Sequence, residues 1–293
     1  KNDDNINPKD KTIIVIGAGI SGLAASKKLK EIGFNVIVLE AQDKVGGRLK
    51  TNRSLGIAFD EGASWIHGID GNPITSLAQE AGMTTFETID DQAESCYDIG
   101  DYSNDKIKIT HNSIESEADY VLVTVPLGVL KANTIQFIPA LPTVKQTAIQ
   151  KIGMNCVNKF ILTWNTPFWD NTQYIVYTPE IKDKFNYFVN VNKFNPTANA
   201  LMTFAYADYA RLTETMTDAQ IINEIMVHLK DIYGNNIPNP TNILRTKWQN
   251  NENSFGAYSY TAVGEHTNVD YFSTAHGAYL SGLREADKII ALL

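Results

Sequence analysis

A glycine-rich turn between two short apolar segments constrains the fold of this chain more than any other feature. The turn reads Gly17-Ala18-Gly19-Ile20-Ser21-Gly22, and it follows Thr12–Ile16 (TIIVI), which predicts a buried strand. After the turn, Ile20–Ile32 predicts a helix, and Asn35–Leu39 (NVIVL) predicts a second strand. Strand, turn, helix and strand make a βαβ unit. The N-terminal segment therefore predicts an α/β fold with a parallel sheet.

The same turn predicts a dinucleotide ligand, and the residues after it narrow that ligand to FAD. The glycines allow a tight turn, a close approach of backbone to a pyrophosphate and close helix–strand packing, while the helix N-terminus attracts the phosphate charge. Glu40 ends the second strand, where its carboxylate can accept hydrogen bonds from the adenosine ribose. Gly46-Gly47-Arg48 suits a loop pressed against the phosphates, since the arginine offers a planar, permanent charge. NAD enzymes do not need such a loop and many flavoproteins have it.

The rest of the chain predicts α/β elements around a β-rich middle. Helical patterns cover 73–81, 142–152, 217–233 and 275–293, and strand patterns cover 106–110, 120–125 and the aromatic segments FILTW, YIVYT, YFVNV and LMTFAY. We expect a Rossmann-like FAD-binding domain interleaved with a β-rich α+β substrate domain. The expected FAD-binding domain comprises 11–75, 101–137 and 245–293, and the expected substrate-binding domain comprises 76–100 and 138–244.

Composition and charge limit the possible partners. The 293 residues carry a net charge of −8, which argues against a nucleic acid or an anionic membrane surface but not against a cationic substrate. No apolar run approaches the roughly 18 residues of a membrane span, so we expect a soluble protein. Cys96 and Cys156 show no metal or redox spacing, and no metal site is predicted. The chain starts at Lys1, which fits a cytoplasmic protein or an exported one after leader removal; compartment and oligomeric state stay open.

Seven segments resemble, in order, the flavin-dependent amine oxidases, and among these the branch of polyamine oxidases and lysine-specific demethylases. The segments are IIVIGAGISGLAAS, VIVLEAQDKVGGRLKT, FDEGASWIHGIDGNPI, ADYVLVTVPLGVLK, NKFILTWNTPFWD, the stretch from Trp248 to Tyr260, and GEHTNVDYFSTAHGAYLSGLREA. They are spread over nearly the whole chain. The resemblance implies the amine oxidase fold and an enzyme that oxidises amines with FAD.

The resemblance also implies which residues form the site. Lys159 matches the lysine that holds a water next to flavin N5, and Trp248 and Tyr258 match aromatic residues beside the flavin and the substrate. His67 matches a residue of the substrate tunnel in polyamine oxidases, and Thr274 lies where the chain passes the pyrimidine end of the flavin. These five are the implied catalytic residues. The implied cofactor-binding residues are Gly17, Gly19, Ile20, Ser21, Gly22, Glu40, Ala41, Gly47, Arg48, Gly62, Ala63, Ser64, Trp65, Trp248, Gly264, Glu265, Thr274 and Ala275.

Two positions narrow the implied subtype. Monoamine oxidases carry a cysteine just before the tyrosine that matches Tyr258, and that cysteine tethers the flavin; here the position is Ala257, which implies a non-covalent flavin. Monoamine oxidases also carry a second tyrosine where this chain has Thr274. Both differences favour a polyamine or alkyl-lysine substrate over a small aryl amine. The implied reaction converts the amine to an imine, which water hydrolyses to an aldehyde and an amine, while oxygen becomes hydrogen peroxide.

The sequence leaves two other functions open. An L-amino-acid oxidase of the same fold would need a cation to clamp the substrate carboxylate, and Arg211 and Arg245 are the unassigned candidates. A flavin-binding scaffold without turnover is the third possibility, and reaction with an amine distinguishes it from the other two.

The chain is shorter than members of this family, and two junctions account for the difference. Near Gly100-Asp101 the family carries a long stretch that includes helices of the substrate domain, and near Val263-Gly264 it carries the strand that delivers GEHT to the flavin. Either further segments of the natural chain are absent from this sequence, or the protein is truncated. A true deletion would strip core strands and expose apolar surface, which favours the first interpretation. A measured intact mass of 32.5 kDa would contradict this first interpretation.

Overall fold

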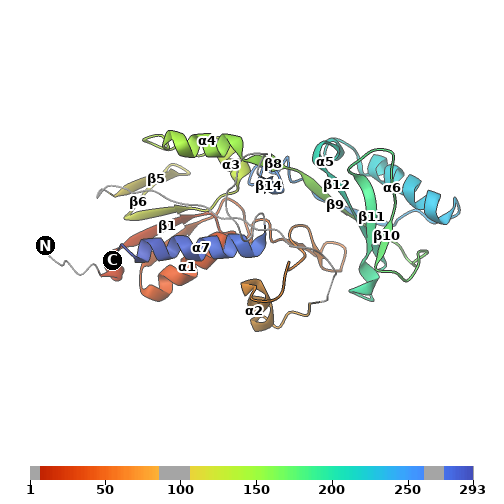
Figure 1. Cartoon of the computed structure of the whole chain (residues 1–293), viewed down its shortest axis with the longest axis horizontal. Coiled ribbons are helices and arrows are strands. Elements are labelled where there is room, and N and C mark those ends of the chain that lie inside the picture. Colours follow the sequence, from red (N-terminus) through yellow and green to blue (C-terminus); the bar gives the residue numbers. More distant parts are fainter. Residues whose placement is uncertain (1–6, 86–105, 261–273, 293) are drawn as a thin grey trace. The chain divides into compact units, whose positions relative to one another are not determined.

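The computed structural model describes residues 7–85, 106–260 and 274–292, and the chain folds into two compact units (Figure 1). Unit 1 comprises 1–50, 62–152 and 260–293, and unit 2 comprises 51–61 and 153–259. Each unit has its own apolar core. This mixed α/β architecture, with two interleaved units, confirms the predicted fold class.

The boundaries of these units differ from the expected domain boundaries at four segments. Unit 1 contains 76–85 and 138–152, which the sequence assigns to the substrate-binding domain. Unit 2 contains 51–61 and 245–259, which the sequence assigns to the FAD-binding domain. The expected boundaries follow the predicted ligand, whereas the units follow contacts within the chain. Which unit binds the cofactor and which the substrate stays a prediction.

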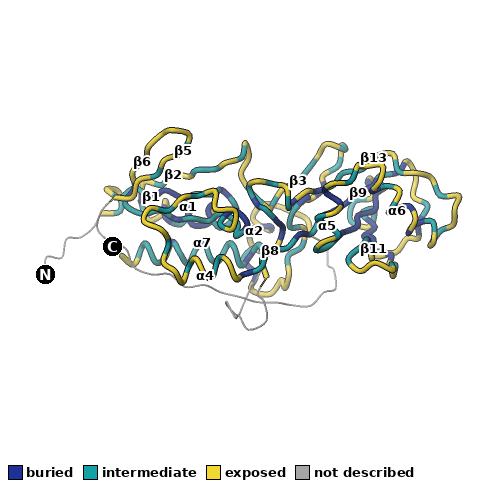
Figure 2. The backbone as a smooth tube through the Cα atoms, turned by 90° about the horizontal axis from the view of Figure 1, so that it is seen from above, coloured by how far each residue is buried: buried dark blue, intermediate teal, exposed yellow. Residues whose placement is uncertain are grey.

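Unit 1 is built on a three-stranded parallel sheet in the order β2-β1-β7. β1 (Thr12–Ile16) lies between β2 (Asn35–Leu39) and β7 (Tyr120–Val123), and α1 (Ile20–Ile32) connects β1 to β2. The middle of β1 is fully buried, which Figure 2 shows as a dark stretch of the tube. A central parallel strand is covered on both faces, and this explains why its sequence is apolar throughout. The predicted βαβ unit is confirmed.

α1 contacts both the sheet and α7 (Ala275–Ile290) through small residues, and the two helices run side by side (Figure 1). The periodicity of α1 predicts an apolar face of Leu23, Leu29 and Ile32. Leu29 is buried, but Leu23 and Ile32 are 39% and 44% exposed, so the prediction is wrong for these two. Glycine, alanine and serine take their place among the buried residues of α1. Close packing against two neighbours favours small side chains.

The other described elements of unit 1 surround this core. They are η1 (Pro8–Asp10), α2 (Pro73–Glu80), the hairpin of β5 (Ile107–His111) and β6 (Ile114–Ala118), α3 (Leu127–Lys131) and α4 (Thr143–Lys151). The helices predicted at 73–81 and 142–152 are therefore confirmed as α2 and α4. The five-residue helix α3 has no clear periodicity in the sequence, because it is too short to show one.

Unit 2 is built on a five-stranded antiparallel sheet in the order β10-β11-β12-β9-β13. Its strands are β9 (Val157–Thr163), β10 (Tyr174–Val176), β11 (Lys184–Asn190), β12 (Ala200–Tyr206) and β13 (Asn242–Arg245). Four of them cover the predicted aromatic segments, and β13 is an additional edge strand. The shorter elements are β3 (Thr51–Asn52), β4 (Phe59–Asp60), β8 (Gly153–Asn155), η2 (Val191–Lys193), α5 (Ala207–Thr213) and β14 (Tyr258–Tyr260).

One long helix covers one face of this sheet. α6 (Asp218–Tyr233) buries Ile221, Ile225 and Leu229 in a core that it shares with the sheet. The helix begins at Thr217, which forms a reciprocal capping box with Gln220. The predicted helix at 217–233 and its threonine cap are thus confirmed. Among the helices of the described chain, none combines the length and the apolar character that a membrane crossing requires.

Candidate active site

The glycine-rich turn of unit 1 has the shape that a bound pyrophosphate needs. Gly17 adopts a φ of 106°, and a Cβ on Gly22 would meet Gly17's carbonyl oxygen and lie 2.7 Å from Thr124 Oγ1. A Cβ on Gly19, in contrast, would meet no described atom within 4 Å. Gly19 is also the N-cap of α1, and its position provides no side-chain cap for the helix amides. The turn therefore leaves room for an anion at the helix N-terminus, and the dinucleotide fits these residues.

Glu40 is fixed beside this turn by two hydrogen bonds. Its Oε2 accepts from the Ala18 backbone N–H at 2.6 Å, and its Oε1 accepts from the Gln42 N–H at 3.0 Å. Each carboxylate oxygen keeps a further lone pair, so Glu40 can accept from a ribose hydroxyl in addition. The structure thus places Glu40 where the sequence predicts it, and its contact with ribose stays a prediction.

The Gly46-Gly47-Arg48 loop lies directly against the glycine-rich turn. The Gly46 N–H donates to the Ala18 carbonyl at 2.8 Å, and Gly19 and Gly46 form an isolated parallel bridge. The Arg48 carbonyl accepts from the Ala63 N–H at 3.1 Å, and a Cβ on Gly62 would collide with that carbonyl. Three predicted cofactor segments that are distant in sequence therefore meet within unit 1.

The start of α7 brings a second group of predicted residues near the loop that contains His67. Thr274 Oγ1 accepts from the Gly277 N–H at 3.1 Å and so caps α7, and Ala275 is the first residue of the helix. His276 is buried, and its pKa is lowered by burial and by the charge of His67. The His67 carbonyl accepts from Asn72 Nδ2 at 2.9 Å. His67 and Thr274 thus lie in one region of unit 1.

Lys159 is a buried lysine in the central part of the sheet of unit 2. It lies on β9, and only 7% of the residue is exposed. Its Nζ donates to the Asp60 backbone carbonyl at 3.0 Å. Burial lowers the pKa of Lys159 to about 8, although the charge of Asp60 acts in the opposite direction. A lysine with this pKa exchanges a proton near neutral pH.

The two predicted aromatic residues of unit 2 differ in exposure. Trp248 is buried. Its backbone N–H donates to Asn158 Oδ1 at 3.1 Å, and its backbone carbonyl accepts from the Gly256 N–H at 2.7 Å. Tyr258 is 46% exposed and follows Ala257, whose N–H donates to the Asn155 carbonyl at 2.9 Å. The Gly256 bond closes the chain between Trp248 and Gly256 into a loop, and the Ala257 bond attaches the residue before Tyr258 to Asn155.

The predicted site residues fall into two sets. In unit 1 the structure gathers the segments 17–22, 40–41, 46–48, 62–67 and 274–275; in unit 2 it holds Lys159, Trp248 and Tyr258. Gly264 and Glu265, together with both junctions, lie outside the described residues. Among the described residues, no three His, Cys, Asp or Glu side chains come together in a way that could hold a metal ion.

Several contributing residues were not predicted. Thr124 Oγ1 donates to the carbonyls of Ile16 and Gly17 at 3.0 and 3.1 Å, and so fixes the end of β1 against β7. In unit 2, the Asp60 carbonyl accepts from Lys159 Nζ, and Asn158 Oδ1 accepts from Thr246 Oγ1. Thr124, Asp60 and Asn158 all lie inside segments that resemble the family, which is the signal that could have identified them.

Comparison with protein families gives one match that covers most of the chain. The model described as "Flavin containing amine oxidoreductase" matches residues 20–102 and 95–265. Among curated proteins, the chain is 25% identical over 435 aligned positions to "Probable polyamine oxidase 4" of Arabidopsis thaliana. This alignment covers 96% of this chain and 86% of the relative. It is 24% identical to "Lysine-specific histone demethylase 1 homolog 1" of the same plant, covering 98% of this chain and 53% of the relative.

Comparison with solved structures gives the same fold. A structure of wild-type putrescine oxidase bound to putrescine matches with a TM-score of 0.75 and 17% identity, covering 96% of this chain and 99% of that chain. The fold predicted from the sequence is therefore confirmed, and the family match confirms the flavin cofactor.

Proposed function

The chain belongs to the family of flavin-containing amine oxidoreductases, and from this we propose that it oxidises a polyamine or a related secondary amine with non-covalently bound FAD. The products are an imine, which water hydrolyses to an aldehyde and an amine, and hydrogen peroxide. The relatives named polyamine oxidases support this substrate class. Ala257, at the position where monoamine oxidases carry their tethering cysteine, supports the non-covalent flavin.

FAD, when bound, would accept the hydride, which carries both electrons, from the carbon next to the amine nitrogen. The residues of unit 1 would hold it. The N-terminus of α1 and the open side of Gly19 would receive the pyrophosphate, and Glu40 would accept hydrogen bonds from the ribose. Arg48 would balance the phosphate charge.

The proposal rests mainly on one observation, the aromatic side chains that lie near Lys159. Phe204 pairs with Lys159 across β12 and β9, so the two side chains share one face of the sheet. Phe204 stacks on Tyr187, with ring centroids 5.2 Å apart, and on Tyr206 at 6.2 Å. Aromatic, water-poor surroundings disfavour the ammonium form of an amine, which must be neutral to lose hydride. Aromatic faces also attract the distal cation of a polyamine.

Lys159 would act on water in this scheme. Its Nζ is held by the Asp60 carbonyl, so the ammonium or amine group has a fixed position. A pKa of about 8 allows it to hold a water molecule as donor or acceptor near neutral pH. That water is suited to proton transfer when the substrate is oxidised.

The amino-acid oxidase alternative finds less support, because both candidate arginines have other partners. Arg211 binds Asp208 at 2.6 Å and also reaches Asn155 and Gln249. Arg245 binds Asp218 at 2.8 Å and donates to the Thr213 carbonyl. Clamping a substrate carboxylate would require either guanidinium to give up these bonds.

Anaerobic mixing of the FAD-loaded protein with single amines tests the proposal. We expect spermine or spermidine to bleach the visible absorbance of the flavin, and oxygen to restore it with release of peroxide. Bleaching by L-amino acids but not by polyamines would favour the amino-acid oxidase. A flavin that stays oxidised with every amine and amino acid would favour the scaffold and reject the proposal.

A further inference from the structure

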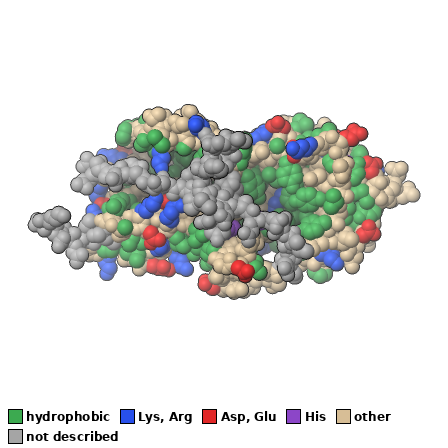
Figure 3. All heavy atoms as spheres, in the orientation of Figure 1, with side chains coloured by type: hydrophobic (Ala, Val, Ile, Leu, Met, Phe, Trp, Pro, Cys, Tyr) green, Lys and Arg blue, Asp and Glu red, His purple; other side chains and the backbone are tan. Residues whose placement is uncertain are grey.

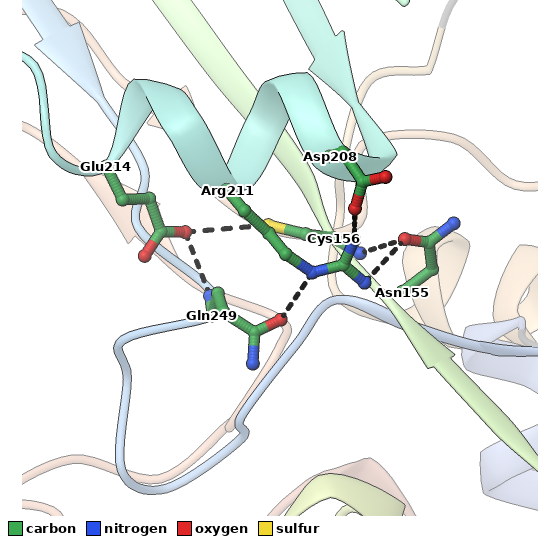
Figure 4. Close-up of polar contacts among 6 residues, drawn as sticks. All are labelled: Asn155, Cys156, Asp208, Arg211, Glu214 and Gln249. Carbon is green, nitrogen blue, oxygen red and sulfur yellow. Dashed lines mark hydrogen bonds and ion pairs between the residues drawn. The ribbon is translucent and has the colours of Figure 1, made fainter.

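Two buried side chains hold three successive backbone amides of the loop that begins at Trp248. The Trp248 N–H donates to Asn158 Oδ1 at 3.1 Å. The N–H groups of Gln249 and Asn250 donate to Glu214 Oε1 and Oε2, each at 2.9 Å. Figure 4 shows Glu214, at the end of α5, directed toward Gln249. This segment has no regular secondary structure, so side chains replace the partners that a helix or strand would supply.

Glu214 is 5% exposed, and its carboxylate collects further donors. Oε1 accepts from Asn158 Nδ2 at 2.8 Å and lies 3.5 Å from Cys156 Sγ (Figure 4 shows the thiol contact). A carboxylate that accepts from several N–H groups at once fixes them in one arrangement. An amide in its place would turn one acceptor into a donor that faces another donor.

Asn158 uses its whole hydrogen-bonding capacity in the same network. It is fully buried; its Nδ2 donates to Glu214 and to the Ala210 carbonyl at 3.1 Å. Its Oδ1 accepts from Trp248 and from Thr246 Oγ1, both at 3.1 Å. Asn158 precedes Lys159 in β9, so its side chain lies on the opposite face of the sheet.

Thr246 links this network to the backbone of Lys159. Thr246 Oγ1 accepts from the Lys159 N–H at 2.9 Å, and the Thr246 N–H donates to the Lys159 carbonyl at 3.1 Å. One continuous set of bonds therefore runs from the backbone of Lys159 through Thr246 and Asn158 to Trp248.

We infer that Asn158 and Glu214 are a positioning pair, which fixes the loop of Trp248 relative to Lys159 so that these two residues of unit 2 keep one geometry during the proposed reaction. The inference rests on the proposed function. Neither side chain lies on the face of the sheet that carries Lys159 and Phe204, so they act through Trp248 and Lys159. A displacement of reacting groups by about 1 Å can lower a rate by about 100-fold.

The test compares Glu214→Gln with Asp208→Asn in FAD-loaded protein. Asp208 lies on the same helix and meets Arg211 on the surface, where its side chain is fully exposed (Figure 4). We expect Glu214→Gln to fold and to bind FAD, but to reduce it about 10- to 100-fold more slowly at saturating spermine, with a KM within about twofold of wild type. Asp208→Asn should reduce FAD at the wild-type rate.

Two further measurements separate positioning from folding and from the proposed function. The visible circular dichroism of the bound flavin reports its surroundings without turnover, and we expect Glu214→Gln to change it and Asp208→Asn to leave it unchanged. If wild type oxidises no amine, the proposed function fails, while this spectrum still tests the pair. If Glu214→Gln does not fold, Glu214→Asp replaces it, with a loss of about three- to tenfold. A folded variant with the wild-type reduction rate and spectrum overturns the inference.

Discussion

At the scale of single residues, Lys159 is the side chain on which the proposed chemistry depends most. It is buried, its Nζ contacts the Asp60 carbonyl, and its pKa is lowered to about 8. Lys159→Met keeps an unbranched side chain only one atom shorter and removes the proton-transfer group. We expect this variant to bind FAD normally and to reduce it about 100-fold more slowly in anaerobic stopped-flow measurements. An unchanged rate would remove Lys159 from the mechanism.

The same lysine predicts a pH dependence of stability. Its pKa lies below the ordinary value of 10.5 in the folded state, so unfolding takes up a proton between about pH 8 and pH 10.5. The wild type therefore gains stability relative to Lys159→Met as pH rises through this window, by at most on the order of 3 kcal/mol. Below about pH 8 the difference should be constant. Denaturant unfolding of both proteins at pH 7, 8, 9 and 10 measures this, and parallel curves throughout would contradict it.

Single residues also show which contacts can be predicted from the sequence and which cannot. Glu40 could be predicted, because a carboxylate at the end of the second strand of a βαβ unit has one spatial neighbour, the glycine-rich turn. Glu214 could not, since its partners Gln249 and Asn250 are distant in sequence and offer only backbone N–H groups. Every residue except proline carries the same backbone N–H donor, so the pattern of side chains in a sequence does not predict such a contact. Asp60 lies in a segment that resembles the family, but its contact with Lys159 could not be predicted either, because it is made through the Asp60 backbone carbonyl.

At the scale of elements, the contact between α1 and α7 decides how the dinucleotide turn is held. Gly282 of α7 lies so close to Ser21 of α1 that a Cβ would collide with the Ser21 carbonyl. Gly282→Ala should therefore separate the helices, although alanine favours a helix more than glycine does. We expect a loss of about 1–3 kcal/mol in the free energy of unfolding and weaker FAD binding. Ser281→Ala, one position away on α7, is the matched control.

Denaturant unfolding and fluorescence titration with FAD measure these two effects. We expect stability and FAD affinity to change together, because Ser21 belongs to the first turn of the helix that would receive the pyrophosphate. A Gly282→Ala protein with unchanged stability would mean that α7 can shift away from α1 without cost.

The elements themselves were predicted well where the pattern is long or repeated. α1, β1 and β2 have the predicted bounds, since strand, turn and helix signals confirm one another there. β13 was not predicted, because four residues at a sheet edge with partial exposure show no alternation. The buried face of α1 was misjudged because periodicity counts large apolar residues, whereas the contact with α7 selects small ones.

At the scale of the whole molecule, the relatives carry more chain than this sequence does. The alignment with the Arabidopsis relative runs over 435 positions, although this chain has 293 residues. The alignment covers 96% of this chain, so many of the extra positions lie between aligned residues of this chain. This agrees with the two junctions inferred from the sequence. The fold could therefore be predicted from the blocks, whereas the residues that surround them in relatives could not.

Charge is the other property of the whole chain that bears on function. The net charge is −8, and on the face that Figure 3 shows, acidic and basic side chains are interspersed over both units. A polyamine carries several positive charges at neutral pH, so the protein attracts it before contact. This attraction extends about 30 Å at 10 mM salt and only about 8 Å at 150 mM.

The proposed substrate class therefore predicts a dependence on ionic strength. Between 10 and 150 mM NaCl, we expect kcat/KM for spermine to fall about tenfold, because encounter is favoured only at low salt. The value of kcat should not change, since salt does not reach groups that are buried with the substrate. A singly charged amine of similar reactivity is the control, and its kcat/KM should fall much less because its charge is smaller. Equal slopes for both amines would mean that the field of the protein has no part in selecting the substrate.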